Sequence, residues 1–481
     1  MALPIIDAVT HPGNKLAVKS CSSTGTAPPS PLPDALLSHR QSRINSPLAA
    51  ISQGVVVNFL ATLATVIGGI VTARGLGVGG RGIVAALIAL PTFVSFVATA
   101  GLPSALIYEA RKNPSAASPL FGAALLLGLL IGLMATAATW LYTPRMLATL
   151  PADLVATGRL LAAFAFAGIL SNVGVAALQA AGQFSACNAI RLAQPLLQLA
   201  GLAALETCGH LEPVPIAILT LAAGLPGLLW SLAWMARRQL PQRSELACAL
   251  RRLTNYASRA AGGELVVGMT SQIDKVIVVG LFAPEALGLY VVAMSLSRVL
   301  AIIPSAVVPV LFPSTAGRAE CEVMNLTSRA AAMTALCVAA GAVALGALGP
   351  WLLALFYGAE FAHADVAFRL LLAEAAVSAV AQVLAQAFMA LNRPVLAGLQ
   401  QVLGVAVAIA LLYALAPHWG INGAALALLI AAMVRLASIY GCFTAIGTGM
   451  PHLTAHFGPN LLLLRSMAAS RLPTCFGRMP P

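Results

Sequence analysis

The sequence predicts an all-α integral membrane protein, with twelve transmembrane helices in two pseudo-symmetric six-helix lobes around a central cavity. Only 9% of the 481 residues are charged, against about 25% in soluble domains, so most of the surface must face lipid. The apolar residues come in blocks of roughly 20, the length of helix that crosses a ~30 Å hydrocarbon layer. The two halves of this apolar region also resemble each other at a fixed offset, which predicts the two lobes.

The chain begins and ends with segments that do not fit this pattern. Residues 1–46 are rich in Pro, Ser and Thr and lack the continuous apolar core of a signal peptide, which predicts a disordered cytoplasmic tail. Residues 446–481 form a second tail, whose LLLLR run is too short to cross a membrane. Twelve spans are expected between them, at about 50–73, 83–108, 119–143, 160–181, 190–207, 213–236, 260–283, 287–312, 330–357, 366–391, 396–416 and 421–443.

The positive charges set the orientation of these spans. With the N-terminus in the cytoplasm, most of the 27 lysines and arginines fall on the cytoplasmic side, as the positive-inside rule requires. The opposite side receives only five, namely Arg74, Arg81, Arg145, Arg159 and Arg369. The longest basic connection, 237–259, is a cytoplasmic linker that separates an N-terminal lobe at 47–236 from a C-terminal lobe at 260–445. We therefore expect an inner-membrane (plasma-membrane) protein with both termini in the cytoplasm.

Several classes of function are disfavoured. The net charge of +12 comes mostly from short connections between spans, so it indicates orientation rather than a nucleic-acid partner. The eight cysteines are scattered without ligand-like spacing, and neither a disulfide framework nor a metal site is expected. No HExxH, Walker or other catalytic constellation is present. An enzyme or a resident cofactor is therefore not expected, and a membrane scaffold or lipid-modifying enzyme is the disfavoured alternative.

Two spans carry matching polar stripes. In the first span the stripe has the spacing i, i+4, i+7 and i+11, which is one helical face, and the seventh span repeats this spacing 206 residues later. The two stripes are Asn58, Thr62, Thr65 and Gly69, and Glu264, Gly268, Ser271 and Lys275. Small polar residues also serve helix packing in membranes, but packing does not require Glu264 and Lys275. The stripes therefore favour a polar cavity between two repeats, the layout of a transporter.

Ionisable side chains inside spans mark candidate functional positions, because they are costly in a membrane. Asp274 and Lys275 are adjacent, so they point about 100° apart on a helix. Asp274 is expected to pair with Arg298 as a structural lock; contact of Arg298 or Lys275 with an anionic substrate is the alternative. Glu374 begins a polar band in the tenth span that continues through Ser378, Gln382 and Gln386. Such groups suit sugar hydroxyls and interhelical hydrogen bonds equally.

GLGVGGRG at 75–82 contains a GxGxxG pattern, but it joins two membrane-length helices instead of closing a βαβ unit. It therefore indicates a tight connection between spans. Arg74 and Arg81 lie there, on the side that otherwise lacks positive charge. Two interpretations of these arginines are open: they face the cavity and attract a phosphate, or they are ordinary loop arginines.

A family resemblance is carried by motifs in a fixed order. ARGLGVGGRG and GLPSALIYEARKNP are followed by SQIDKVIVVGLFAPEALGLYVVAMSLSRVLAIIPSAVVPVLFP (271–313), then FYGAEF (356–361), QAFMALNRP (386–394) and WGINGAALA (419–427). In this order they resemble the polysaccharide-unit (O-antigen type) flippases of the multidrug/oligosaccharidyl-lipid/polysaccharide exporter superfamily. The resemblance covers roughly residues 50–445 and excludes both tails.

This resemblance implies alternating access and a polyprenyl-diphosphate-linked oligosaccharide, moved from the cytoplasmic to the periplasmic leaflet for lipopolysaccharide or exopolysaccharide biosynthesis. It places Arg81, Asp274 and Arg298 near the cavity. The implied partners are this lipid-linked oligosaccharide, a coupling ion (proton or sodium), a polysaccharide polymerase and glycosyltransferases. A multidrug/cation antiporter of the same superfamily is the main alternative, disfavoured because the first two spans offer only Glu109 as an acid. A lipid II flippase is disfavoured because that group commonly has two additional helices.

Overall fold

The computed structural model describes residues 47–113, 117–237, 243–315, 318–391 and 393–446. Contacts divide the chain into Met1–Leu48 and Ala49–Pro481, and the description below concerns the second unit. Every regular element in the described ranges is a helix. The predictions for the N-terminal tail and for residues 447–481 lie outside these ranges.

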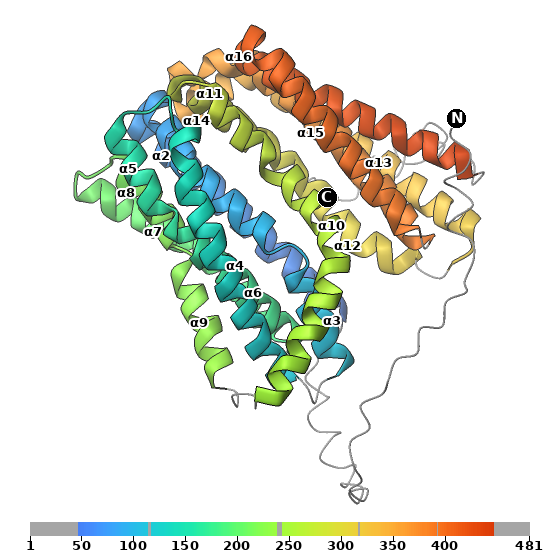
Figure 1. Cartoon of the computed structure of the whole chain (residues 1–481). Helices are drawn as coiled ribbons and strands as arrows, with labels where there is room; N and C mark the ends of the chain where they lie inside the picture. The colour runs from blue at the N-terminus through green and yellow to red at the C-terminus, as the bar shows by residue number, and fades with distance from the viewer. Residues whose placement is uncertain (1–46, 114–116, 238–242, 316–317, 392, 447–481) are drawn as a thin grey trace, which may run out of the picture. The chain divides into compact units, whose positions relative to one another are not determined.

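Eight α-helices make up the first half of the described chain (Figure 1). They are α2 (Pro47–Ala98), α3 (Leu102–Lys112), α4 (Ala117–Met146), α5 (Ala152–Leu161), α6 (Ala163–Ala180), α7 (Phe184–Thr207), α8 (Pro213–Ala222) and α9 (Leu225–Ala236).

The second half contains seven α-helices and two 3₁₀-helices. They are α10 (Arg243–Leu281), α11 (Pro284–Ser297), η3 (Arg298–Ala301), α12 (Ile302–Thr315), α13 (Glu320–Ala347), α14 (Gly349–Tyr357), η4 (Ala359–Ala364), α15 (Asp365–Ala390) and α16 (Pro394–Ile446).

These helices give the twelve predicted spans. Eight stretches of the described chain are long and apolar enough to cross a membrane. Two of them contain two spans each, because α2 is broken at Gly77 (φ 67°) and α16 at Gly420 (φ 57°). Glycine adopts this left-handed backbone region without steric cost, so the chain reverses there between one span and the next. The more polar helices α7 and α10 supply the fifth and seventh spans.

Each lobe is built around one central helix. In the first lobe α6 contacts α3, α4 and α9, and in the second α15 contacts α12, α13 and α16. These partners occupy equivalent places in the span order: the second, third and sixth spans pack on the fourth, and the eighth, ninth and twelfth pack on the tenth. The predicted all-α fold with two pseudo-symmetric six-helix lobes is therefore confirmed.

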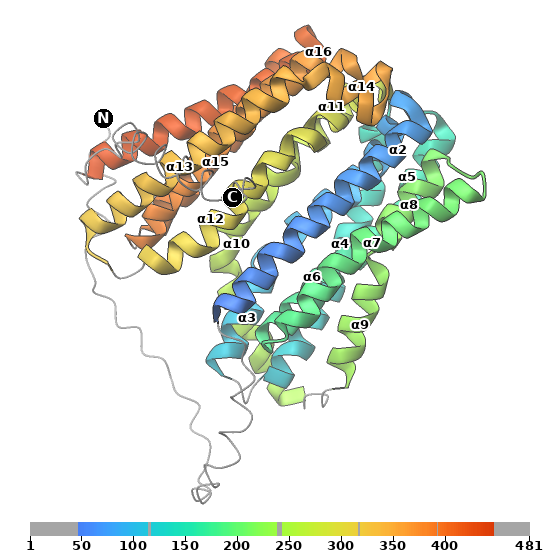
Figure 2. The ribbon, with the colours of Figure 1, turned by 180° about the vertical axis from the view of Figure 1, so that it is seen from behind.

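Helix α10 connects the two lobes. Its first turns pack on α3 and α4, where Ala249 and Leu253 are buried, and α10 also contacts α16 of the second lobe. Figures 1 and 2 show it running between the two groups of helices. From Arg243 onward the predicted linker is therefore helical and continuous with the seventh span. The sequence did not predict this, because the basic residues of 243–259 suggested a loop.

The two lobes meet through glycines that are equivalent in the repeat. A Cβ at Gly82 would overlap the carbonyl oxygen of Pro284, and a Cβ at Gly288 would overlap that of Val78. Gly288 and Pro284 are Gly82 and Val78 shifted by 206 residues. The contact is thus reciprocal, like that between the subunits of a two-fold dimer, and it brings α2 and α11 together at one end of the cavity.

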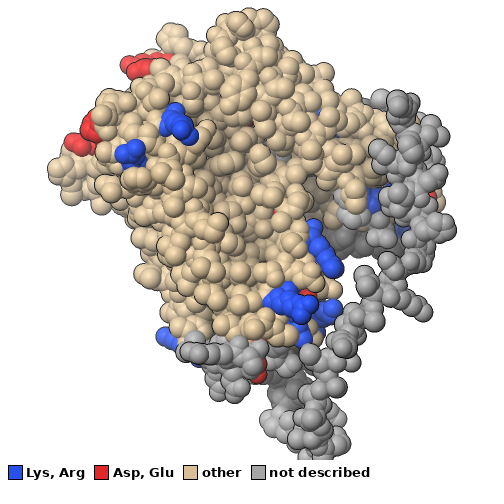
Figure 3. Space-filling model, viewed as in Figure 1, with Lys and Arg blue, Asp and Glu red and all other residues tan. Residues whose placement is uncertain are grey.

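The surface has the polarity of a membrane protein. In the view of Figure 3 most of the described face carries no charge, and Lys, Arg, Asp and Glu side chains gather toward its edges. Large apolar side chains such as Met134 (74% exposed) and Leu141 (67% exposed) lie on the outside of the protein. Their exposure fits a lipid environment.

Candidate functional site

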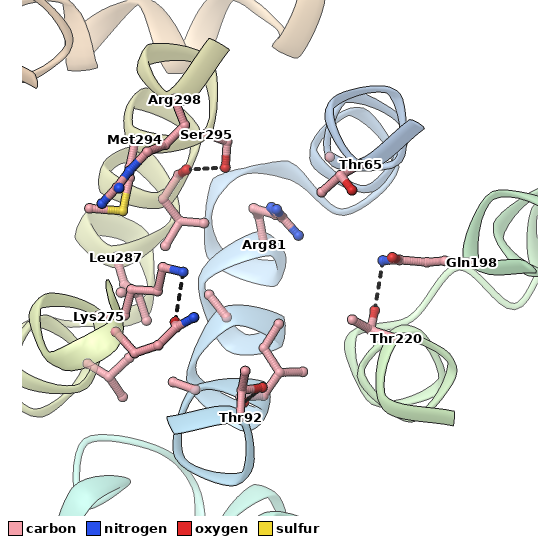
Figure 4. A pocket seen from close by; sticks show the side chains of 17 residues that line it. Thr65, Arg81, Thr92, Gln198, Thr220, Lys275, Leu287, Met294, Ser295 and Arg298 are labelled. Atoms are coloured by element: carbon pink, nitrogen blue, oxygen red, sulfur yellow. Dashed lines mark hydrogen bonds between the residues drawn. The ribbon is translucent and has the colours of Figure 1, made fainter. Parts of the chain in front are cut away.

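A central cavity of about 370 Å³ is lined by both lobes. Its polar and charged lining residues are Thr65, Arg81, Thr92, Gln198, Thr220, Gln272, Lys275, Ser295 and Arg298. Figure 4 shows Lys275 and Arg298 on one side, Gln198 and Thr220 across from them, and Arg81 between. No acidic residue is among the described residues that line this cavity.

The repeat determines which positions line the cavity on the second and eighth spans. The second span contributes Arg81, Ala85, Ile88, Ala89 and Thr92, and the eighth contributes Leu287, Val291, Met294, Ser295 and Arg298. Each residue of the second set lies 206 positions after its counterpart in the first set. The lining positions are therefore equivalent, whereas the charges are not. In the repeat Arg81 corresponds to Leu287, and Arg298 corresponds to Thr92.

Arg81 lies on the second span, directly after the break at Gly77. Its Nη2 atom is 3.7 Å from the position that a Cβ at Gly69 would take, so the guanidinium lies beside Gly69 of the first span. Its Nε atom is buried and has no hydrogen-bond partner within the described ranges. An unpaired cation beside a cavity is available to an anion.

Lys275 and Asp274 face different cavities, as their 100° separation predicted. Lys275 lines the central cavity and donates from Nζ to Oε1 of Gln272 at 2.9 Å. Asp274 is 3% exposed and lines a second pocket of about 220 Å³ in the second lobe, called here the C-lobe pocket.

Arg298 lines both the central cavity and the C-lobe pocket. Its Nη2 atom lies 4.0 Å from Oδ2 of Asp274, which is the ion pair expected from the sequence. This distance is at the limit for an ion pair, and neither carboxylate oxygen of Asp274 has a hydrogen bond within the described part of the chain. The ion pair therefore does not hold the guanidinium of Arg298 in a fixed position.

The C-lobe pocket contains a second acid and a second arginine. Glu374 accepts from Oγ of Ser378 at 2.6 Å, and Gln382 also lines the pocket. Arg435 is buried and donates from Nη1 to Oε1 of Gln401 at 3.3 Å. Arg435 was not among the predicted site residues, although its position inside the twelfth span is the signal that would have identified it.

Four predicted residues, Asn58, Thr62, Arg74 and Glu264, are not among the residues that line these cavities. Thr62 donates to the carbonyl of Asn58 within the first span. Glu264 accepts at 2.7 Å from the backbone N–H of Gly101, which precedes α3, and so ties α10 to that helix. Arg74 donates to the carbonyl of Phe356 at 2.9 Å and also to that of Leu355, joining the two lobes. The side chain of Ser271 lies outside the described part of the structure.

A third, uncharged pocket adjoins the central cavity inside the first lobe. This N-lobe pocket has a volume of about 360 Å³ and shares Thr92 and Thr220 with the cavity. Its further polar lining residues are Ser95, Ser171, Asn172 and Gln194. Asn172 is held by hydrogen bonds to the carbonyl of Ser95 (3.2 Å) and to Oγ1 of Thr99 (3.3 Å).

Residues 71–366 match the family described as "Polysaccharide biosynthesis protein". The chain belongs to this family. The match includes Arg81, Lys275 and Arg298, and it covers more than half of the sequence. A comparison with curated protein sequences gives no match.

Solved structures of known membrane transporters share the fold. The lipid II flippase MurJ in an inward closed conformation has a TM-score of 0.71 at 12% identity, over 87% of this chain and 92% of MurJ. An inward-facing multidrug resistance MATE family transporter has a TM-score of 0.61 at 14% identity, over 85% and 96%. A MOP superfamily transporter from Pyrococcus furiosus has a TM-score of 0.55 at 16% identity, over 83% and 96%. This member of the polysaccharide biosynthesis family is therefore a multi-pass membrane protein with the fold of these transporters.

Proposed function

We propose that this transporter flips polyprenyl-diphosphate-linked oligosaccharide units from the cytoplasmic to the periplasmic leaflet by alternating access, for surface polysaccharide biosynthesis. The observation that carries the proposal is the charge of the central cavity. Arg81, Lys275 and Arg298 line it together, and none of its described lining residues is acidic. Guanidinium and ammonium groups bind phosphate oxygens through charge-assisted hydrogen bonds. A diphosphate is the part of such a substrate that these three cations recognise.

The uncharged polar groups suit the saccharide. Gln198 and Thr220 line the central cavity from the first lobe, and the N-lobe pocket adds Ser171 and Gln194. Hydroxyl and amide groups both donate and accept hydrogen bonds, as sugar hydroxyls do. The sugar of the unit therefore occupies the first-lobe side of the cavity, and the diphosphate lies near the three cations.

The same charges disfavour the multidrug/cation antiporter. Uptake of a cation into the first lobe needs an acid in its cavity, and neither the central cavity nor the N-lobe pocket has one among its described lining residues. The acids that do line a cavity, Asp274 and Glu374, lie in the C-lobe pocket.

The C-lobe pocket suits a coupling ion, proton or sodium. In the proposed cycle the ion neutralises Asp274, which loosens its 4.0 Å pair with Arg298. Because Arg298 lines both sites, it then turns fully to the diphosphate. The proposal also includes the inner membrane as the location, cytoplasmic termini, and glycosyltransferases and a polymerase that act before and after this step.

Deletion of the gene tests whether the protein flips lipid-linked oligosaccharide units at all. Lipid-linked units are expected to accumulate on the cytoplasmic side of the membrane and surface glycan to be lost, as measured by mass spectrometry of carrier lipids. Unchanged glycans together with altered drug sensitivity would instead support the antiporter.

Arg81→Gln tests whether the positive charge of the central cavity binds the substrate. Export is expected to fall roughly tenfold, because loss of one charge-assisted contact of about 1.5 kcal/mol weakens binding by that factor. The thermal stability of the purified protein should not fall, since Arg81 Nε has no hydrogen-bond partner in the described part of the chain. Arg145→Gln, at an exposed position at the end of α4, is the matched control. Equal export by Arg81→Gln and Arg145→Gln would remove Arg81 from substrate binding.

A further inference from the structure

A groove of about 750 Å³ lies on the outside of the first lobe, between α4 and the α5–α6 connection. Figure 1 shows α4 and α5 side by side in the first lobe. The groove is separate from the central cavity, since the two share no lining residue. Its lining residues are Leu133, Thr136, Ala137, Trp140, Leu141, Arg159, Leu160, Ala162, Ala163 and Phe166.

The walls of the groove are apolar and face outward. Leu133 is 62% exposed and Leu160 is 76% exposed. In a transmembrane protein such side chains contact lipid, because no water is present in the hydrocarbon region. Acyl chains are the hydrocarbon that surrounds a membrane protein, and their chemistry matches the walls of this groove.

One cation interrupts these apolar walls. The guanidinium of Arg159 lies over the ring of Trp140, with 4.8 Å between Cζ and the ring centroid. Its Nε atom is buried without a hydrogen-bond partner, and no acid within the described ranges pairs with Arg159. Arg159 lies in the last turn of α5. An arginine on a lipid-facing surface is compensated by an anion or by the headgroup region.

We propose that this groove binds an anionic glycerophospholipid, with its phosphate on Arg159 and an acyl chain along Leu133 and Leu160. Trp140 covers one face of the guanidinium by a cation–π contact, and the fork of N–H groups at its edge matches phosphate oxygens. An anionic headgroup is favoured over a zwitterionic one, because no acid lines the groove to accept an ammonium group. Tryptophan is also enriched at the level of lipid headgroups.

Native mass spectrometry of the delipidated full-length protein tests this site. The probes are phosphatidylglycerol and phosphatidylethanolamine with the same acyl chains. The wild type is expected to retain one phosphatidylglycerol at a roughly tenfold lower lipid concentration than phosphatidylethanolamine, the factor of one charge-assisted contact. Arg159→Gln should abolish this preference. Arg145→Gln, an arginine of α4 that does not line the groove, should keep it.

A second variant tests the same site even if Arg159→Gln fails to fold. Ala137→Phe fills the groove at an exposed position of α4 and leaves Arg159 in place. It is expected to weaken phosphatidylglycerol binding with an unchanged melting temperature in detergent. Equal binding of the two lipids by the wild type, or an unchanged preference in both variants, would overturn the proposal.

A third probe distinguishes the occupant. If polyprenyl phosphate displaces phosphatidylglycerol and depends on Arg159, the groove holds the carrier lipid of the substrate, and the proposed phospholipid site is wrong. This outcome would leave the proposed flipping function intact. Conversely, a confirmed phospholipid site does not depend on what the central cavity transports.

Discussion

Asp274 and Arg298 form one ion pair but differ in their surroundings. The side chain of Asp274 is 4% exposed, whereas that of Arg298 is 48% exposed. A buried charge that loses its partner costs about 3–5 kcal/mol, while an exposed one costs far less because water replaces the partner. The two residues therefore differ in what their removal does to stability.

We predict that Arg298→Ala lowers the thermal stability of the purified protein more than Asp274→Ala does, because it leaves Asp274 buried and unpaired. The double variant Asp274→Ala/Arg298→Ala should recover most of this loss. Thermal unfolding in detergent measures the stabilities. Both single variants are also expected to reduce glycan export while the protein remains in the membrane. Equal stability losses in the two single variants would show that the asymmetry of burial has no energetic effect.

Most of the residues that the sequence identified in the central cavity are charged. Lys275 and Arg298 stood out because a charge inside a span is rare, and Arg81 because it is a positive charge on the side that otherwise lacks them; the three line one cavity. Gln198 and Thr220 were not predicted, since an uncharged polar residue in a span is equally consistent with helix packing. The hydrogen bond of Glu264 to Gly101 could not be read from the sequence either, because the two residues meet only after the lobes pack.

At the scale of helices, the contact between Gly82 and Gly288 decides how closely α2 and α11 approach. A Cβ at either position would overlap a backbone carbonyl of the other lobe, which cannot move aside as a side chain can. We infer that this contact closes one end of the central cavity, the periplasmic end in the predicted orientation.

Gly82→Ala and Gly288→Ala should each keep this end from closing and reduce export roughly tenfold or more. Overpacking costs about 1–3 kcal/mol, and 1.4 kcal/mol corresponds to a factor of ten. The alkylation rate of Ala85→Cys, in the cavity lining, should rise in both variants. Gly280→Ala on α10 is the matched control, since nothing lies within 4 Å of its added Cβ. A similar loss of export in Gly280→Ala would attribute the effect to a general cost of replacing glycine.

The long elements were predictable from the sequence, and the short ones were not. Apolar blocks of roughly 20 residues determine the spans, so all twelve were found. The break of the eighth span at η3 leaves no mark in composition. The start of α14 was missed although Gly349 and Pro350 mark it. The continuation of α10 from Arg243 through the basic segment was also missed, since its stability comes from packing against α3 and α4.

For the whole molecule, native cysteines at three exposed positions report the orientation in the membrane. Cys208 lies directly after α7, whereas Cys248 lies near the start of α10 and Cys321 near the start of α13. In the predicted topology Cys208 is periplasmic, and the other two are cytoplasmic.

A membrane-impermeant thiol reagent should therefore label Cys208 in right-side-out vesicles, and Cys248 and Cys321 only after the vesicles are opened. Peptide mass spectrometry identifies the labelled positions, and Cys208→Ser provides the control for the first signal. Labelling of Cys248 in sealed right-side-out vesicles would show that the orientation is the reverse of the predicted one. An equal reaction of Cys208 and Cys321 there would contradict the odd number of spans between them.

The position of Arg298 between two cavities has a thermodynamic consequence. Under the proposed function, an ion at Asp274 raises the affinity for the diphosphate by some factor, because it releases the arginine. Linkage then requires that the diphosphate raise the affinity for the ion by the same factor. The shared guanidinium, seen at 4.0 Å from Asp274, would thus allow either ligand to report the binding of the other at equilibrium, without any movement of the lobes.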